Sequence, residues 1–300
     1  MQMEEWEDRA DRSEVLKKIR RIEIVTRRAA TDTLAGQYHS VFKGRGIEFD
    51  QVRPYTIGDD IRSIDWNVTA RQGAPFIKQY QEERELTAML MVDLSASGLF
   101  GTDSLRKIEL AAELSALLAF SAIQNNDKVG LILFTDKVER VILPQKGRKH
   151  VLRVISEILT YRPEGRGTDI NEALTYLSRL KITSSIVFLI SDFISPDYST
   201  GLKIVSRKHD LVGLLVRDPK EATLPDVGLV PLEDLESGQV VWVDTSDKAV
   251  RRYHEEYWRK LEEERRRLLG KLKVELVEME CGQDYVPKLA AFFRRRAKRR

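Results

Sequence analysis

The chain has 300 residues, of which 42% are hydrophobic and 32% are charged, a composition that excludes a disordered or low-complexity protein. Its 50 basic and 47 acidic side chains leave a formal charge of only +3, so nucleic acid is not the default partner. The single cysteine, Cys281, excludes an internal disulfide and fits a reducing compartment. There is no signal peptide and no apolar run of membrane-spanning length, so we expect a soluble, cytoplasmic protein.

The first part of the chain predicts a helix followed by a β-rich segment. Residues 13–30 place Ile19 and Ile22 at helical spacing, which is typical of an amphipathic helix. From residue 38 to residue 80, short apolar alternations are interrupted by glycine and proline, which favours short strands and tight turns. We therefore expect residues 1–83 to form an N-terminal extension.

Residues 84–300 are expected to form an α/β domain. Its sequence contains five near-continuous apolar runs, which suit strands that are buried on both faces: TAMLMVD, DKVGLILF, SSIVFLISD, DLVGLLV and KVELVEM. Helical patterns separate them, in SLRKIELAAELSALLAFSAI and in residues 170–180. Strands that alternate with helices predict a three-layer, doubly wound and mostly parallel sheet, with a ligand crevice at the carboxyl ends of its strands.

Two additions to this domain are predicted near its C-terminal end. Residues 225–244 contain two short extended pieces around a Glu-Ser-Gly turn, which indicates a hairpin insertion. A long helix is expected from about Asp247, with Tyr253 and Tyr257 among the residues on its inward face.

Oxygen-bearing side chains gather at the predicted crevice. Asp93, Ser95 and Ser97 follow the first strand directly, and the loop of residues 165–169 and the strand end at Asp192 reach the same edge of the sheet. Without nitrogen or sulfur donors, such a set favours Mg²⁺, with Mn²⁺ or Ca²⁺ as alternatives. The simpler alternative is that these side chains only satisfy backbone groups in turns.

The segment DLSAS, with a later GTD loop and a later ISDF, resembles the metal-ion-dependent adhesion site of von Willebrand factor A domains. The resemblance implies that the hydroxyl groups of Ser95, Ser97 and Thr168 are metal ligands. It also implies that Asp93 and Asp192 hold the metal, either directly or through water. Asp169 is not part of this pattern, and we expect it to cap a helix.

The segment FKGRGIEFDQVRPYTIGDDIRSIDWNVTARQGAPFIKQYQEER, residues 42–84, resembles the signature of the bacterial family called domain of unknown function fifty-eight. The resemblance continues through DLSAS and RDPKEATLP to the terminal FFRRR, and so covers nearly the whole chain. Relatives commonly carry methionine where this chain has Gly98. The resemblance implies a protein that is encoded beside a MoxR-type AAA+ ATPase and acts with it in a chaperone-like role, maturing or remodelling client proteins.

The prediction for function is therefore a non-enzymatic adaptor that binds proteins through a divalent cation. An acidic residue of a partner, either the ATPase or a client, would complete the coordination of the metal. Arg166, in the loop that carries Thr168, is predicted to assist in binding that acid. No phosphate-binding loop occurs in the sequence, so any ATPase activity must belong to a partner.

A serine hydrolase is one competing interpretation. Ser95 or Ser97 would be the nucleophile, and Asp192 and His209 follow in the chain order of α/β-hydrolases. However, His209 precedes its strand, so we expect it at the opposite edge of the sheet, outside hydrogen-bonding reach of the serines.

The basic C-terminal tail gives a second competing interpretation, binding to nucleic acid or to an acidic membrane surface. Arg294–Arg300 carries six positive charges but no interleaved aromatic residues that would read bases. Such cations at the end of a helix are also favoured by the helix dipole alone.

The mixed charges of residues 45–71 suit either a docking surface for the partner or a buried ion-pair network, and we favour the network.

Overall fold

The computed structural model describes residues 17–30, 38, 41, 48–81, 86–101 and 106–299. The chain divides into two compact units, one of residues 42–86 and one that combines Met1–Val41 with Thr87–Arg300. Residues 17–29 form the expected helix. This helix groups with the larger unit rather than with the β-rich segment, because Arg148 Nε donates to Glu23 Oε1 over 2.7 Å.

The smaller unit is built on a two-stranded antiparallel sheet. Its strands are β1 (Glu48–Pro54) and β2 (Phe76–Gln81), and between them lie η2 (Ile61–Ser63) and the short helix α3 (Trp66–Gln72). Both nitrogens of the Arg53 fork donate to Asp59 over 2.8 Å. The charged side chains therefore tie together the loop that follows β1, although this ion pair is not buried.

The larger unit contains a six-stranded sheet with the order β10-β7-β6-β3-β4-β5. The five predicted apolar runs form β3 (Thr87–Asp93), β4 (Lys128–Phe134), β6 (Ile186–Ser191), β7 (Asp210–Arg217) and β10 (Glu275–Glu280), all mutually parallel. The edge strand β5 (Val138–Gln145) is antiparallel to β4 and was not predicted. Most of its residues are partly exposed, so it lacks a continuous apolar run.

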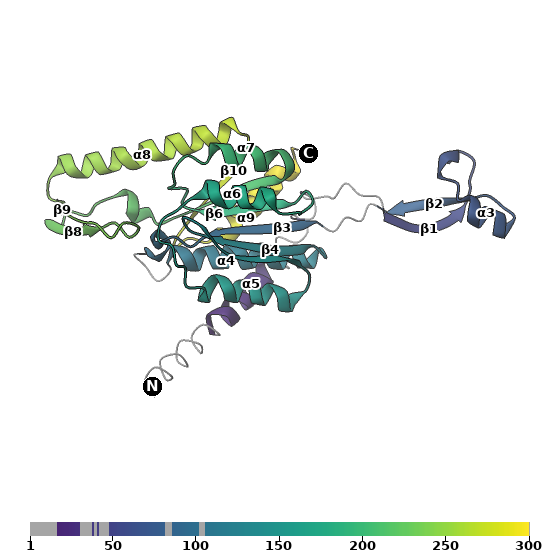
Figure 1. The fold of residues 1–300 in the computed structure, drawn as a ribbon, viewed down its shortest axis with the longest axis horizontal. Helices are drawn as coiled ribbons and strands as arrows, with labels where there is room; N and C mark the ends of the chain where they lie inside the picture. The colour runs from purple at the N-terminus through teal and green to yellow at the C-terminus, as the bar shows by residue number, and fades with distance from the viewer. Residues whose placement is uncertain are drawn as a thin grey trace. The chain divides into compact units, whose positions relative to one another are not determined.

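Helices cover both faces of this sheet, which confirms the expected layering (Figure 1). The predicted helix α4 (Lys107–Gln124) and α5 (Arg148–Thr160) lie on one face. The predicted helix α6 (Ile170–Arg179) and α7 (Ser199–Lys208) lie on the other, where they pack on Met89, Met91 and Leu189 in a buried cluster. Helices α5 and α7 were not predicted.

The predicted hairpin and long helix are both present. The hairpin consists of β8 (Leu229–Glu233) and β9 (Val240–Asp244), and α8 (Lys248–Lys271) begins after the N-cap Asp247. The prediction that Tyr253 and Tyr257 lie on the inward face of α8 was wrong, since both side chains are exposed. The helix reaches the core only near its end, at Leu269. The chain closes with α9 (Tyr285–Ala297). None of the described helices combines the length and the apolar character that crossing a membrane requires.

Candidate metal centre

The candidate site lies where the order of the central strands reverses. β3 and β6 are parallel neighbours; β4 pairs with β3 on one side, and β7 pairs with β6 on the other. Ligand sites of doubly wound sheets form at this switch point, outside the carboxyl ends of the strands. Asp93 is the last residue of β3 and Asp192 directly follows β6, so both carboxylates meet there as predicted.

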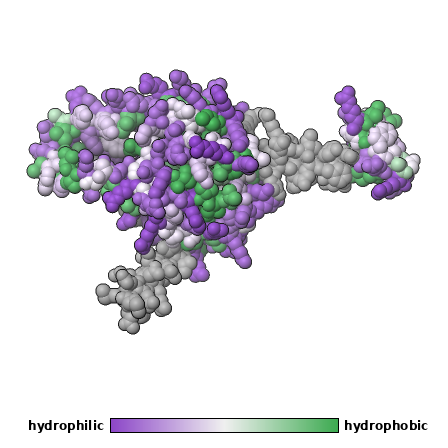
Figure 2. Space-filling model, viewed as in Figure 1, coloured by the Kyte–Doolittle hydropathy of each residue, from purple (hydrophilic) through white to green (hydrophobic). Residues whose placement is uncertain are grey.

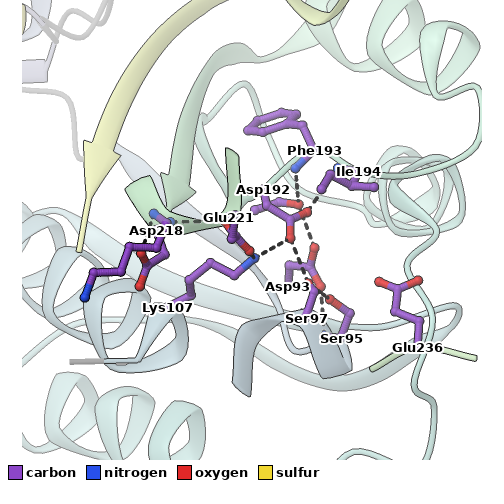
Figure 3. Close-up of polar contacts among 12 residues, drawn as sticks. Asp93, Ser95, Ser97, Lys107, Asp192, Phe193, Ile194, Asp218, Glu221 and Glu236 are labelled. Carbon is purple, nitrogen blue, oxygen red and sulfur yellow. Dashed lines mark hydrogen bonds and ion pairs between the residues drawn. The ribbon is translucent and has the colours of Figure 1, made fainter. Parts of the chain in front are cut away.

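The serine loop after β3 brings three of the predicted oxygens together (Figure 3). The Ser95 amide donates to Asp93 Oδ1 over 2.9 Å, which turns the chain sharply into η3 (Ala96–Leu99). Ser95 Oγ and Ser97 Oγ are 2.9 Å apart, and Ser97 Oγ donates to Asp192 Oδ2 over 2.7 Å. Residues about one hundred positions apart in sequence thus share one hydrogen-bonded cluster.

Asp93 is buried behind this cluster. Its Oδ2 accepts a 2.6 Å hydrogen bond from Ser191 Oγ. Burial, followed by the nearby charge of Asp192, raises the pKa of Asp93 to about 7, although hydrogen bonds from Ser191 and Ser95 partly oppose this shift. The two carboxylates therefore repel each other, a repulsion that a bound cation would relieve.

Thr168 reaches the same rim on a firmly held loop. The Ala96 amide donates to the Arg166 carbonyl over 2.9 Å, and the Asp169 amide donates to the Thr135 carbonyl over 2.9 Å. Asp169 caps α6 as predicted, since its Oδ1 accepts from the Glu172 amide. The Arg166 side chain is exposed beside the serine loop.

The hydroxyl of Thr168 has a partner that the sequence did not suggest. Its Oγ1 donates over 2.7 Å to Glu236 Oε1, which belongs to the turn of the β8–β9 hairpin. The Thr168 hydroxyl therefore bonds to the hairpin rather than to the two serines or the two aspartates, and its loop joins the serine loop through the backbone bond from Ala96 to Arg166. The Glu-Ser-Gly pattern predicted only a hairpin turn, and the sequence carried no signal that its glutamate would reach this rim.

Lys107, the first residue of α4, is the second residue that sequence reasoning missed. Its buried Nζ lies 2.9 Å from Asp192 Oδ2 and 2.6 Å from Glu221 Oε1. Burial alone lowers the pKa of Lys107, but the charges of Asp192 and Glu221 outweigh it and hold the pKa above its ordinary value. A lysine on the same helical stripe as the buried Leu110 and Leu114 was the signal available in the sequence.

A cavity of about 20 Å³ opens among these groups. Its polar lining comes from Asp93, Ser95, Ser97, Lys107, Ser191 and Asp192. A cavity of this size holds about one water-sized particle, and its oxygen donors are of the kind that bind a small divalent cation. The same lining includes the Lys107 ammonium group, and it does not include Thr168. Among the described residues, no group of three or more His, Cys, Asp or Glu side chains could hold a metal ion, and the predicted set contains only two carboxylates.

A second cavity, of about 350 Å³, borders Asp192 on its other side. It lies between the end of β7, η4 (Pro219–Ala222) and α8, and its lining includes Arg217, Trp258 and Arg265. Arg265 Nη1 donates to the Asp192 carbonyl over 3.0 Å. The backbone that holds Asp192 is therefore supported directly by α8.

His209 lies away from the serine loop, as its position before β7 predicted. It caps the C-terminal end of α7, and its Nδ1 is 2.6 Å from Ser185 Oγ, just before β6. The serines of the loop lie at the carboxyl edge of the parallel strands, and His209 lies at their amino edge. His209 is therefore out of reach as a general base for Ser95 or Ser97.

The comparisons with known proteins establish the family. The chain matches the family described as Protein of unknown function DUF58 over residues 51–265, and it belongs to that family. The proteins named uncharacterized protein Rv1480 of Mycobacterium tuberculosis and uncharacterized protein Mb1516 of Mycobacterium bovis are each 32% identical over 225 residues. These alignments cover 74% of this chain and 71% of each relative. The family predicted from the signature of residues 42–84 is thus confirmed.

Solved structures with a similar arrangement are more distant. The conserved hypothetical protein BatB from Bacteroides thetaiotaomicron aligns with a TM-score of 0.46 and 18% identity, over 71% of this chain and 99% of that chain. An aerotolerance-related membrane protein from Bacteroides fragilis aligns with a TM-score of 0.46 and 15% identity, over 72% of this chain and 100% of that chain.

Proposed function

We propose that this protein is a divalent-cation-dependent, protein-binding adaptor with a von Willebrand factor A-like domain, and that it is not an enzyme. The observation that carries the proposal is the hydrogen-bonded cluster of Ser95, Ser97 and Asp192 at the switch point of the sheet. These residues line a cavity of about 20 Å³. Magnesium, or manganese or calcium in its place, would supply a positive centre there that attracts a partner's carboxylate.

Each side chain has a role in this proposal. Asp93 and Asp192 would supply the negative charge of the site, and Ser95, Ser97 and Thr168 would supply neutral oxygens. A site with only two carboxylates holds little negative charge and leaves coordination positions on the metal open, so an acidic residue from a partner is favoured as a further ligand. The exposed guanidinium of Arg166 beside the serine loop would attract the same acid.

The proposed partner is a MoxR-type AAA+ ATPase, a client protein, or both, in chaperone-like maturation or remodelling in the cytoplasm. The family resemblance supports this choice of partner, and the cation site supports the acid-dependent mode of binding. The basic tail is a weaker candidate surface. Arg296 is buried, with an ion pair to Asp210 and with Nε 3.2 Å from Glu275 Oε2, and Arg299 also pairs with Glu275.

The test is affinity capture from a native extract with the tagged protein, in magnesium and in EDTA, read by mass spectrometry. We expect an AAA+ ATPase to be captured only with magnesium, and capture to be lost in Ser97→Ala. Ser206→Ala is the matched control, because this serine lies near the C-terminal end of α7, where its Oγ donates to the Lys203 carbonyl of the same helix. Equal capture in EDTA, or by a folded Ser97→Ala protein, would contradict the proposal.

A further inference from the structure

The larger cavity, between the end of β7, η4 and α8, has walls that are held together on both sides of Trp258. On α8, His254, Trp258 and Glu262 are spaced four residues apart and so lie along one side of the helix. His254 Nε2 lies 2.8 Å from the Glu221 carbonyl oxygen of η4. Glu262 Oε1 accepts from Arg217 Nη1, at the end of β7, over 3.3 Å. The space of about 350 Å³ is therefore bounded by connected elements, and it falls in the size range of small-molecule sites.

Arg265 lines this cavity as a partly buried cation without an ion pair. Its Nη1 donates to the Asp192 carbonyl, and it has no carboxylate partner among the described residues. Its buried Nε has no hydrogen-bond acceptor there either, and the same is true of Arg217 Nε in the same lining. Burial lowers the pKa of Arg265, and nearby negative charges offset only part of this effect. An oxygen atom with a negative charge would supply both the missing acceptor and the missing charge.

Three acidic side chains of the lining already have cationic partners. Asp192 and Glu221 share the ammonium group of Lys107. Glu262 forms an ion pair with Arg217. These carboxylates therefore do not require a cation from a ligand, but they would repel a ligand that carries several negative charges.

The other charged groups of the lining leave Arg265 as the cation to be compensated. Asp218 caps η4, where its Oδ1 accepts from the Lys220 amide. Glu255 and Arg259 are exposed and lie one turn apart on α8, so their charges cancel. The lining thus favours a ligand with a single negative charge over a multiply charged one such as a nucleotide.

The rest of the lining suits an apolar body. It consists of Leu215, Pro219, Ala222 and Trp258, together with the small polar side chain of Thr223. An indole ring offers a flat face that packs well against another aromatic ring. A ligand that combines one acidic group with an aromatic ring would therefore match both parts of the cavity.

We propose that this cavity binds a small aromatic monocarboxylate, with its carboxylate on Arg265 and its ring on Trp258. The carboxylate accepts from N–H groups of the guanidinium that the Asp192 carbonyl leaves unused. This site is separate from the proposed cation site, and the inference does not rest on the proposed function. Asp192 borders both cavities, so the ligand lies directly behind the rim.

The test compares two probes that differ only in charge, 4-fluorophenylacetate and the neutral 4-fluorophenylacetamide. Each is titrated with the full chain, and fluorine line widths give the dissociation constants. We expect the acid to bind about tenfold more tightly than the amide, because only the acid forms a charge-assisted bond with Arg265. Arg265→Gln should remove this preference. The control Arg267→Gln should keep it, because this residue is exposed on the same helix and does not line the cavity.

A second pair of variants tests the aromatic part of the site. Exposed apolar side chains gather over the β8–β9 hairpin, Trp242 among them, and offer an aromatic probe another surface (Figure 2). We expect Trp258→Leu to weaken binding of both probes about fivefold and Trp242→Leu to leave it unchanged. Circular dichroism checks that each variant is folded.

Several outcomes would overturn the inference. These are equal affinity for the acid and the amide, an acid preference that survives Arg265→Gln, and binding that depends on Trp242 instead of Trp258. Absence of binding of both probes to the wild type would overturn it as well. None of these results affects the proposed cation site, whose test is capture in magnesium and in EDTA.

Discussion

Lys107 supplies a positive charge that compensates buried carboxylates at the rim. Its ammonium group bridges Asp192 and Glu221, and the side chains of all three are nearly buried. Removing one partner of a buried ion pair costs far more than the pair itself contributes, because the other charge is left without compensation. Lys107 therefore acts within the site as a tethered monovalent cation, next to the position proposed for the metal.

Replacing Lys107 by methionine tests this role. We expect Lys107→Met to lower the free energy of unfolding by about 3 kcal/mol in EDTA, because Asp192 and Glu221 then face each other unpaired. Magnesium should restore part of the loss by supplying positive charge. Urea denaturation with and without magnesium measures both effects.

The control for this prediction is Lys137→Met. Lys137 pairs with Glu164 over 2.6 Å, but both side chains are exposed, so the solvent screens their charges. We expect the Lys137→Met protein to have the stability of the wild type both in EDTA and in magnesium. Equal stability of the Lys107→Met protein and the wild type would show that the buried bridge contributes nothing.

At the scale of an element, the loop before α6 determines where Thr168 lies. Glu139 on β5 accepts hydrogen bonds from the amides of Glu164 and Gly165, over 3.1 and 2.8 Å. A Cβ atom on Gly165 would come within 2.3 Å of Thr135 Oγ1, and still closer to the Asp136 carboxylate. The unpredicted edge strand β5 thus fixes a loop of the candidate site, and only glycine fits so close to it.

Two alanine substitutions in this loop separate crowding from a general loss of flexibility. Gly165→Ala should lower the free energy of unfolding by about 2 kcal/mol and weaken Mn²⁺ binding, because the loop must move away from Thr135. Gly167→Ala should change neither, since the nearest atoms to its Cβ lie at ordinary contact distances of 3.7 and 3.8 Å. Thermal unfolding and Mn²⁺ titration provide the measurements, and equal behaviour of the two variants would refute the argument.

At the scale of the whole molecule, His209 makes stability depend on pH. It is buried, and burial, together with the nearby charge of Lys208, lowers its pKa from 6.5 to about 4. Below pH 6.5 the unfolded chain binds a proton at this position, whereas the folded chain does not bind one until about pH 4. The stability that the neutral imidazole provides is therefore present above pH 6.5 and is lost as the pH falls toward 4.

The measurement compares wild type with His209→Asn, which can still bond to Ser185. From pH 7 to pH 4 we expect the wild type to lose roughly 3 kcal/mol more than the variant, at about 1.4 kcal/mol for each pKa unit. The raised pKa of Asp93 acts in the opposite direction over an overlapping range, so the difference between the two proteins, and not either curve alone, isolates His209. A difference that does not vary with pH would contradict the prediction.

The sequence by itself determined most of the sheet and four of the residues that meet at its rim. A parallel strand covered on both faces must be apolar along its whole length, so β3, β4, β6, β7 and β10 were readable as continuous runs. Residues directly after such strands reach one edge, which brings the DLSAS loop to Asp192.

Only the tertiary structure decided which charges complete that rim. Lys107 and Asp192 are 85 positions apart, and Thr168 and Glu236 are 68 positions apart, in elements whose local patterns concern only their own helix or turn. Strand β5 was missed for a related reason, because an edge strand that is half exposed has no continuous apolar run. Hydrophobic periodicity records which side of an element is buried, whereas the pairing of polar side chains depends on how distant elements are packed together.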